Sequence, residues 1–215
     1  MKTWIKFCGT TSLGDAVASI EAGANALGFI FAPSQRRITP EKAQEIIAVL
    51  PREVEKIGVF LNAGAKQIRR VVDQVDLTGI QMHGDSDFAP EVYRYLPQSR
   101  RDSLRKIKTI LIDETFEMTL DAAAAVPGVV DAWLFDSGAG SGKTFDWQAA
   151  RAQLGERRGR FIIAGGLTSG NVGEAIRTFS PWGVDVVSGI ETGPGRKDPA
   201  RMKAFVAAVR KAEQP

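Results

Sequence analysis

The sequence contains very few of the residues that form disulfides and metal centres. Among its 215 residues there is one cysteine, Cys8, and one histidine, His83. A single cysteine cannot form an intramolecular disulfide, and a single histidine cannot by itself build a catalytic zinc site. We therefore expect no metal, and we expect Cys8 to be a reduced thiol in a cytoplasmic protein.

Excess charge and long apolar segments are also lacking. The formal net charge is only +3, which gives no reason to expect a nucleic-acid or membrane partner. No apolar run approaches the roughly 18 residues of a membrane span. The first residues lack the apolar core of a secretory signal, and nothing outside the main fold suggests a fused partner. A basic run (Arg100, Arg101, Arg105 and Lys106) is interpreted as a solvated surface.

The sequence instead contains a regular alternation of short β-type runs and helical segments. The expected strands are 3–8, 26–31, 56–61, 79–82, 106–112, 132–135, 161–164 and 184–187. The expected helices are 12–22, 39–50, 65–75, 87–96, 116–126, 147–154, one starting near 169, and 199–212. Eight strand–helix units predict an α/β fold, a single (βα)8 TIM barrel formed by residues 1–215. An open doubly wound sheet is the alternative architecture.

Glycines follow the last two expected strands. Gly165 and Gly166 come after the first of them, and Ser188 and Gly189 after the second. Glycine lets backbone N–H groups approach an anion closely, and barrels of this kind often hold a substrate phosphate in these two loops. The pattern predicts a phosphate site. The alternative is that these glycines only relieve strain in ordinary turns.

Reactive side chains occupy the ends of other expected strands. A thiol (Cys8), an arginine (Arg36) and carboxylates (Asp113 and Asp136) would converge with the glycine turns at one mouth of a barrel. This set suits proton transfer on an anionic sugar phosphate. Asp185 falls inside an expected strand, where an inward-facing carboxylate needs a polar partner or a ligand.

Several motifs resemble those of the phosphoribosylanthranilate isomerases of tryptophan biosynthesis, and the resemblance spans nearly the whole chain. The motifs are Lys6-Phe7-Cys8-Gly9 with Thr11, Ser34-Gln35-Arg36-Arg37-Ile38, Gln81-Met82-His83-Gly84, Leu134-Phe135-Asp136, Phe145-Asp146-Trp147, Ala164-Gly165-Gly166-Leu167, and Ser188-Gly189-Ile190-Glu191 through Pro194-Gly195-Lys197-Asp198. The resemblance implies a single βα barrel. It also implies an Amadori rearrangement of a small phosphoribosyl substrate, without metal or organic cofactor.

The resemblance also implies roles for particular residues. Cys8 corresponds to the general base and Asp136 to the general acid, and Arg36 to the arginine that pairs with the anthranilate carboxylate. The turns at Gly165-Gly166 and Ser188-Gly189 correspond to the phosphate site. Further substrate contacts are expected from Gln81, His83 and Asp185. A monomer and a homodimer are both compatible with the sequence.

Two other function classes remain open at this stage. Residues 137–144, which read SGAGSGKT, come close to the nucleotide-binding pattern G-x-x-x-x-G-K-[ST], although Ser137 stands at its first position. A nucleotide-binding protein would use Lys143 on the phosphates of ATP. A catalytically silent barrel that acts as a binding module is the third class. Turnover of the phosphoribosyl substrate without ATP or metal would separate all three.

Overall fold

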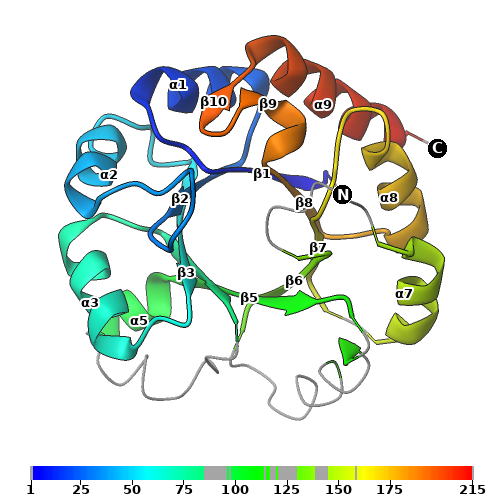
Figure 1. Ribbon diagram of the computed structural model, residues 1–215, viewed down its shortest axis with the longest axis horizontal. Helices are drawn as coiled ribbons and strands as arrows, with labels where there is room; N and C mark the ends of the chain where they lie inside the picture. Colours follow the sequence, from blue (N-terminus) through cyan, green and yellow to red (C-terminus); the bar gives the residue numbers. More distant parts are fainter. Residues whose placement is uncertain are drawn as a thin grey trace.

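Eight of the strands, β1 to β8, close into one parallel barrel. The computed structural model describes residues 2–84, 96, 98–113, 115–116, 120, 130–138, 145–157 and 159–214. The strands pair in chain order from β1 to β8, and β8 closes the ring by pairing with β1. Figure 1 shows the helices arranged around the outside of this ring. The predicted TIM barrel is therefore confirmed.

The barrel strands are short and evenly spaced along the chain. They are β1 (Trp4–Cys8), β2 (Ala26–Ile30), β3 (Glu55–Leu61), β4 (Gly79–His83), β5 (Arg105–Leu111), β6 (Ala132–Asp136), β7 (Phe161–Ile163) and β8 (Gly183–Val186). The described helices are α1 (Leu13–Ala22), α2 (Pro40–Ile47), α3 (Ala65–Gln74), α5 (Gln98–Ser103), α7 (Trp147–Leu154), α8 (Val172–Phe179) and α9 (Pro199–Ala212).

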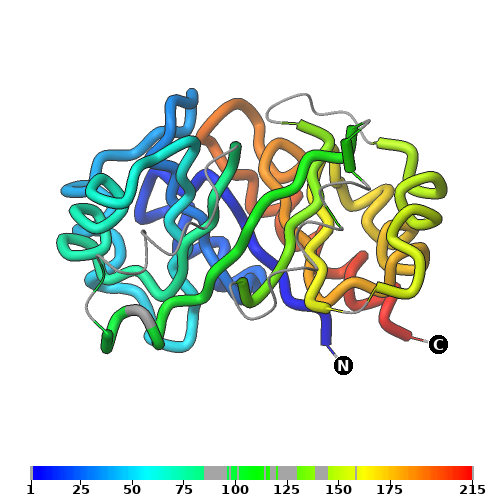
Figure 2. Tube along the Cα trace, turned by 90° about the horizontal axis from the view of Figure 1, so that it is seen from below, coloured from blue at the N-terminus to red at the C-terminus, as the bar shows by residue number. Residues whose placement is uncertain are grey.

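A small hairpin follows the last barrel strand. It consists of a 3₁₀ turn η1 (Ser188–Ile190) and the antiparallel strands β9 (Glu191–Gly193) and β10 (Arg196–Lys197). Figure 2 shows this hairpin on one side of the barrel and both chain termini on the other. The hairpin thus lies beside the C-terminal ends of the strands, where βα barrels carry their active sites.

Most predicted element boundaries agree with the structure within a few residues. The helices expected at 147–154 and 199–212 match α7 and α9. The helix expected from residue 169 begins at Val172, because side chains first form a turn. The Thr168 N–H donates to Asn171 Oδ1 at 2.7 Å, and the Gly170 N–H donates to Thr168 Oγ1 at 3.2 Å. Most of each of the helices expected at 87–96 and at 116–126 lies outside the described residues.

Helix starts follow local capping chemistry. Ser12 and Asp146 accept backbone N–H groups of the first turns of α1 and α7. Thr39 and Asp198 do the same for α2 and α9, each of which has a proline at its first position. Such side chains satisfy N–H groups that have no partner within the helix. The described helices contain none that is long and apolar enough to cross a membrane.

The alternation of side chains along each strand determines what faces the barrel interior. In β1, Ile5 and Phe7 pack outward against the helices, while Trp4 belongs to a separate cluster inside the barrel. Because strand side chains alternate, Lys6 and Cys8 face inward with Trp4. The inner cluster also contains Ala26, Ile57, Ile107, Ala132, Leu134, Ile162 and Ala164. These inward positions are therefore apolar, whereas Lys6, which lies two residues beyond Trp4 on the same face of β1, is charged.

A buried ion pair links the adjacent strands β1 and β8 inside the barrel, below the mouth. Lys6 lies opposite Asp185 in the β1–β8 register, and its Nζ lies 3.0 Å from Asp185 Oδ1. Lys6 is fully buried and Asp185 nearly so. A charged residue is rarely buried unless it is paired, and this pairing explains the inward carboxylate of β8.

Candidate active site

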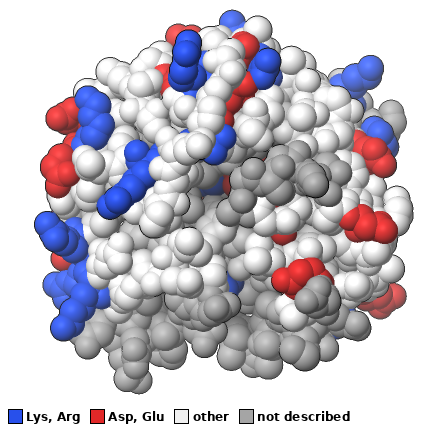
Figure 3. All heavy atoms as spheres, viewed as in Figure 1, with Lys and Arg blue, Asp and Glu red and all other residues white. Residues whose placement is uncertain are grey.

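A cavity of about 570 Å³ opens at the C-terminal ends of the strands. Figure 3 shows a hollow near the centre of this face, with basic side chains at its edge. Most of the residues singled out in the sequence line it together. These are Cys8, Arg36, Gln81, His83, Asp136, Gly165, Gly166, Asp185 and Ser188. Residues from six different strand ends and loops thus meet at one site, as the barrel topology requires.

Cys8 ends β1 and is a buried free thiol. Its sulfur occupies space left by Gly28 on β2, because a Cβ at Gly28 would lie 2.5 Å from Cys8 Sγ. Burial raises the pKa of the Cys8 thiol, and the positive charge of Lys6 opposes this effect. The effect of burial on the thiol pKa is the larger of the two.

Asp136 ends β6, which is three strands from β1 around the ring. Its Oδ1 accepts the Gly138 N–H at 3.1 Å. Burial and the negative charge of Asp185 raise the pKa of the Asp136 carboxyl group. The partly desolvated environment expected for a general acid is therefore present at this position.

Arg36 reaches the cavity from the loop between β2 and α2. Its guanidinium makes a two-pronged contact with Glu191. Nε lies 3.1 and 2.9 Å from the two carboxylate oxygens, and Nη2 lies 2.7 Å from Oε2. The aliphatic part of the side chain packs over Gly9, where an added Cβ would lie 2.7 Å from Arg36 Cδ. Arg36 therefore has a well-defined position at the rim of the cavity.

The two glycine turns approach each other closely. Gly165 and Gly166 have φ values of 83° and 60°, a conformation that other residues adopt only with strain. A Cβ at Gly189 would lie 2.0 Å from the Leu167 carbonyl oxygen. Within the described part of the chain, the N–H groups of Gly165 and Gly166 donate to no protein acceptor. Such N–H groups can bind an anion.

Gln81 and His83 face the same cavity from β4. The Gln81 amide nitrogen lies 2.8 Å from His83 Nε2 and 3.2 Å from Thr109 Oγ1. Burial, with help from Lys6 and Lys108, lowers the pKa of His83 to about 4. The ring is therefore neutral at pH 7, which suits a hydrogen-bonding group better than a proton donor. The Gln81 Oε1 atom is buried and has no hydrogen-bond partner among the described residues.

Three residues that sequence analysis assigned no role turn out to organise the site. Lys6 pairs with Asp185, and Glu191 and Lys197 pair with each other at 2.9 Å. The signal for Lys6 was its position two residues before Cys8, on the same face of the strand. Glu191 and Lys197 belong to a motif of the family resemblance, but no strand pattern predicts their pairing, because they lie in a hairpin outside the barrel. In the described ranges, no three His, Cys, Asp or Glu side chains are arranged to hold a metal ion.

The closed barrel, with a thiol, a carboxyl group and an arginine at its C-terminal mouth, defines a TIM-barrel enzyme. The family model for N-(5'phosphoribosyl)anthranilate (PRA) isomerase matches residues 5–208. This chain belongs to that family, and it is an isomerase.

This chain is similar to known members of the family in both sequence and structure. The N-(5'-phosphoribosyl)anthranilate isomerase of Bacillus cereus is 42% identical over 207 residues, which cover 94% of this chain and 96% of the relative. The crystal structure of the enzyme from Thermus thermophilus has a TM-score of 0.82 at 31% identity, covering 97% and 99% of the two chains. A structure in complex with reduced 1-(o-carboxyphenylamino)-1-deoxyribulose 5-phosphate has a TM-score of 0.79 at 33% identity, with the same coverage.

Proposed function

We propose that this enzyme converts N-(5-phosphoribosyl)anthranilate into 1-(2-carboxyphenylamino)-1-deoxyribulose 5-phosphate by an Amadori rearrangement, as a step of tryptophan biosynthesis. Family membership supports the activity. The observation that carries the mechanism is the placement of Cys8 and Asp136 on strands three positions apart, both lining one cavity. Two proton-transfer groups in this arrangement can flank a sugar without touching each other.

The reaction requires one proton to be delivered and another to be removed. Asp136 donates a proton to the furanose ring oxygen while the bond from that oxygen to the anomeric carbon breaks. The amine nitrogen lone pair then forms the Schiff base. The Cys8 thiolate removes a proton from the next sugar carbon, and the electrons of that C–H bond generate an enolamine. Tautomerisation gives the ketone, so one carbon is oxidised and its neighbour reduced without an external redox partner.

The remaining groups of the cavity suit the two anionic ends of this substrate. We assign Arg36 to the anthranilate carboxylate, because guanidinium groups bind carboxylates in a two-pronged geometry. The turns at Gly165-Gly166 and Ser188-Gly189 are assigned to the phosphate. Gln81, His83 and Asp185 line the space between them and supply further substrate contacts.

Turnover without added nucleotide or metal tests this function. The purified enzyme should consume N-(5-phosphoribosyl)anthranilate in the presence of EDTA and in the absence of ATP, seen as loss of the substrate's fluorescence. Titration with ATP and Mg²⁺ should show no binding in the micromolar range, about −8 kcal/mol. Lys143 lies outside the described residues. A saturating ATP isotherm would favour the nucleotide-binding alternative, and absence of turnover would favour a silent barrel.

The phosphate assignment predicts a binding defect when the glycine turns are altered. In Gly189→Ala the new Cβ would meet the Leu167 carbonyl oxygen at 2.0 Å, so one of the two loops must move. We expect KM to rise at least about tenfold with a smaller change in kcat, because the phosphate is bound in ground and transition states alike. Gly170→Ala is the matched control, since its Cβ would make only an ordinary contact at 3.6 Å. Loss of kcat at an unchanged KM would contradict the assignment.

A further inference from the structure

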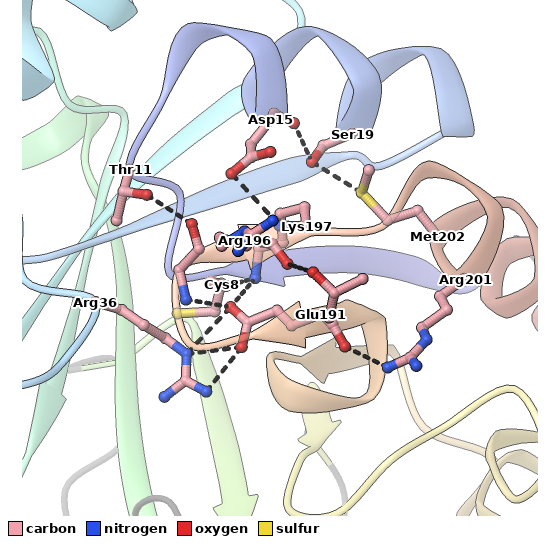
Figure 4. A network of polar contacts seen from close by, with 12 residues as sticks. Cys8, Thr11, Asp15, Ser19, Arg36, Glu191, Arg196, Lys197, Arg201 and Met202 are labelled. Atoms are coloured by element: carbon pink, nitrogen blue, oxygen red, sulfur yellow. Dashed lines mark hydrogen bonds and ion pairs between the residues drawn. The ribbon is translucent and has the colours of Figure 1, made fainter.

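Glu191 lies at the centre of a buried network beside the cavity. Its carboxylate accepts hydrogen bonds from Arg36, from Lys197 Nζ at 2.9 Å and from the Gly195 N–H at 3.3 Å. Figure 4 shows Arg36 and Lys197 converging on this carboxylate. Although burial by itself would raise the pKa of Glu191, hydrogen bonds from Arg36 and the charge of Lys197 hold it below its ordinary value. Glu191 is therefore an ionised acceptor at neutral pH.

The contact between Glu191 and Arg36 uses only one side of the guanidinium group. A guanidinium presents N–H donors in a rigid planar fork, and two different edges can each bind a carboxylate. Glu191 accepts from Nε and Nη2, which form the side edge. The end edge, formed by Nη1 and the second Nη2 hydrogen, donates to no acceptor within the described ranges. Arg36 lines the cavity, so this edge remains available there.

We propose that Glu191 is a positioning residue for substrate recognition: it orients the guanidinium of Arg36 so that the end edge receives the anthranilate carboxylate. This inference rests on the proposed function, which assigns Arg36 to that carboxylate. Gly9 contacts the aliphatic part of the Arg36 side chain, and Glu191 holds its guanidinium group. A restrained guanidinium loses less conformational entropy when it binds its ligand.

Lys197 connects the Glu191 carboxylate to the end of the strand that carries Cys8. Its ammonium group is fully buried and donates both to Glu191 and to the backbone carbonyl of Cys8. Glu191 is therefore in contact with Arg36, which we assign to the substrate carboxylate, and through Lys197 with the end of β1, which carries the proposed base Cys8. The Glu191 carboxylate thus pairs with two cationic side chains, Arg36 and Lys197, and the excess positive charge of these three side chains suits an anionic group of the substrate.

The test compares two inhibitors in the parent enzyme and in Glu191→Gln. The first is reduced 1-(o-carboxyphenylamino)-1-deoxyribulose 5-phosphate, and the second is the same compound without the ring carboxylate. In the parent enzyme we expect the carboxylated compound to bind roughly ten- to a hundredfold more tightly, the value of a hydrogen bond between charged groups. In Glu191→Gln the ratio of the two inhibition constants should fall to within about threefold of unity, because Arg36 is no longer oriented.

A second arginine–glutamate pair provides a matched control. Arg105 makes the same two-pronged contact with Glu55, with Nε at 2.6 Å and Nη2 at 3.0 Å, but it lies at the start of β5 and therefore at the opposite end of the barrel. Glu55→Gln removes a comparable ion pair and should leave the ratio of inhibition constants at the parent value. A ratio that falls equally in Glu55→Gln would show a general structural effect and would overturn the proposal.

The remaining outcomes separate this inference from the function on which it rests. If the parent enzyme does not discriminate between the two inhibitors, the assignment of Arg36 fails, and the positioning role fails with it. If the parent discriminates and Glu191→Gln discriminates equally well, the positioning role alone is overturned. Because Glu191→Gln leaves Lys197 buried without its counter-charge, folding can suffer. In that case the double variant Glu191→Gln, Lys197→Met also removes the unpaired positive charge. The ratio of the two inhibition constants, measured in this double variant, then tests the proposal in the same way.

Discussion

Asp136→Asn is expected to lower kcat by at least about 10²–10⁴-fold while KM changes little. The amide has nearly the shape of the carboxylic acid and can still accept the Gly138 N–H, but it cannot deliver a proton to the ring oxygen. Proton transfer contributes mainly in the transition state, so the loss should fall on kcat. Steady-state kinetics with the phosphoribosyl substrate measure both parameters.

The residual activity of Asp136→Asn should also have a changed pH dependence. In the parent enzyme the reactive form combines a protonated Asp136 with an ionised Cys8, which predicts a bell-shaped profile of kcat/KM. Without the carboxyl group, the residual kcat/KM should rise as the thiol ionises and should not fall again at higher pH. A variant that keeps the full bell-shaped profile and more than about a tenth of kcat would exclude Asp136 as the acid.

The raised pKa of Asp136 also predicts how stable the folded Asp136→Asn variant should be. Burial, with a contribution from Asp185, raises the pKa of Asp136 in the folded protein. Its contribution to stability is therefore largest below the ordinary aspartate pKa and declines as pH rises through the raised value. Asp136→Asn should be at least as stable as the parent at pH 7 by thermal unfolding. Asp131→Asn, at the residue just before β6 and thus at the opposite end of the barrel, is the matched control and should retain parental kcat.

Cys8→Ser should cause a loss of kcat of similar size, at least about 10²–10⁴-fold, with little change in KM. A serine hydroxyl is a far weaker acid than a thiol, so the variant has almost no oxyanion available to remove the sugar C–H proton. The substitution makes no large cavity, and the Lys6–Asp185 pair below it keeps both partners. The fold should therefore survive, which binding of the reduced product analogue with parental affinity would verify.

The alternatives to Cys8 as the base are few, and the structure indicates how each would behave. A Cys8→Ser enzyme with more than about a tenth of parental kcat would remove the thiol from the mechanism. The base would then have to be Asp185, Asp113 or His83. Asp185 is held by the Lys6 ammonium, and Asp113 is exposed and accepts from Thr115. The pKa of His83, about 4, makes its ring a weak base.

The barrel and the composition of its mouth could be predicted because they depend on local patterns. Alternating strands and helices, capped by residues such as Ser12 and Asp146, are encoded within short windows of sequence. Once eight parallel strands close into a ring, residues that end strands must meet at one face. The sequence alone therefore predicts that Cys8 and Asp136 lie at the same mouth, although 128 positions separate them in the chain.

The start of α8 was predicted less accurately, because side-chain hydrogen bonds compete with the backbone hydrogen bonds of the helix there. The sequence predicts a helix starting near residue 169, yet two side-chain hydrogen bonds within Thr168–Asn171 hold this segment as a turn, and α8 begins only at Val172. Such bonds offer the backbone an alternative to the helix, and their balance depends on the neighbouring loop. Gly189, which packs against the Leu167 carbonyl, belongs to that neighbouring loop.

The sequence by itself therefore determined the fold class and the identity of the strand-end residues. The tertiary structure alone decided how those residues are paired. Arg36 contacts a carboxylate 155 positions away, and Lys6 contacts one 179 positions away. These contacts depend on strand register and on the path of the β9–β10 hairpin, which local patterns do not encode. The pKa values follow from the same cause, because burial and neighbouring charge exist only once the chain is packed.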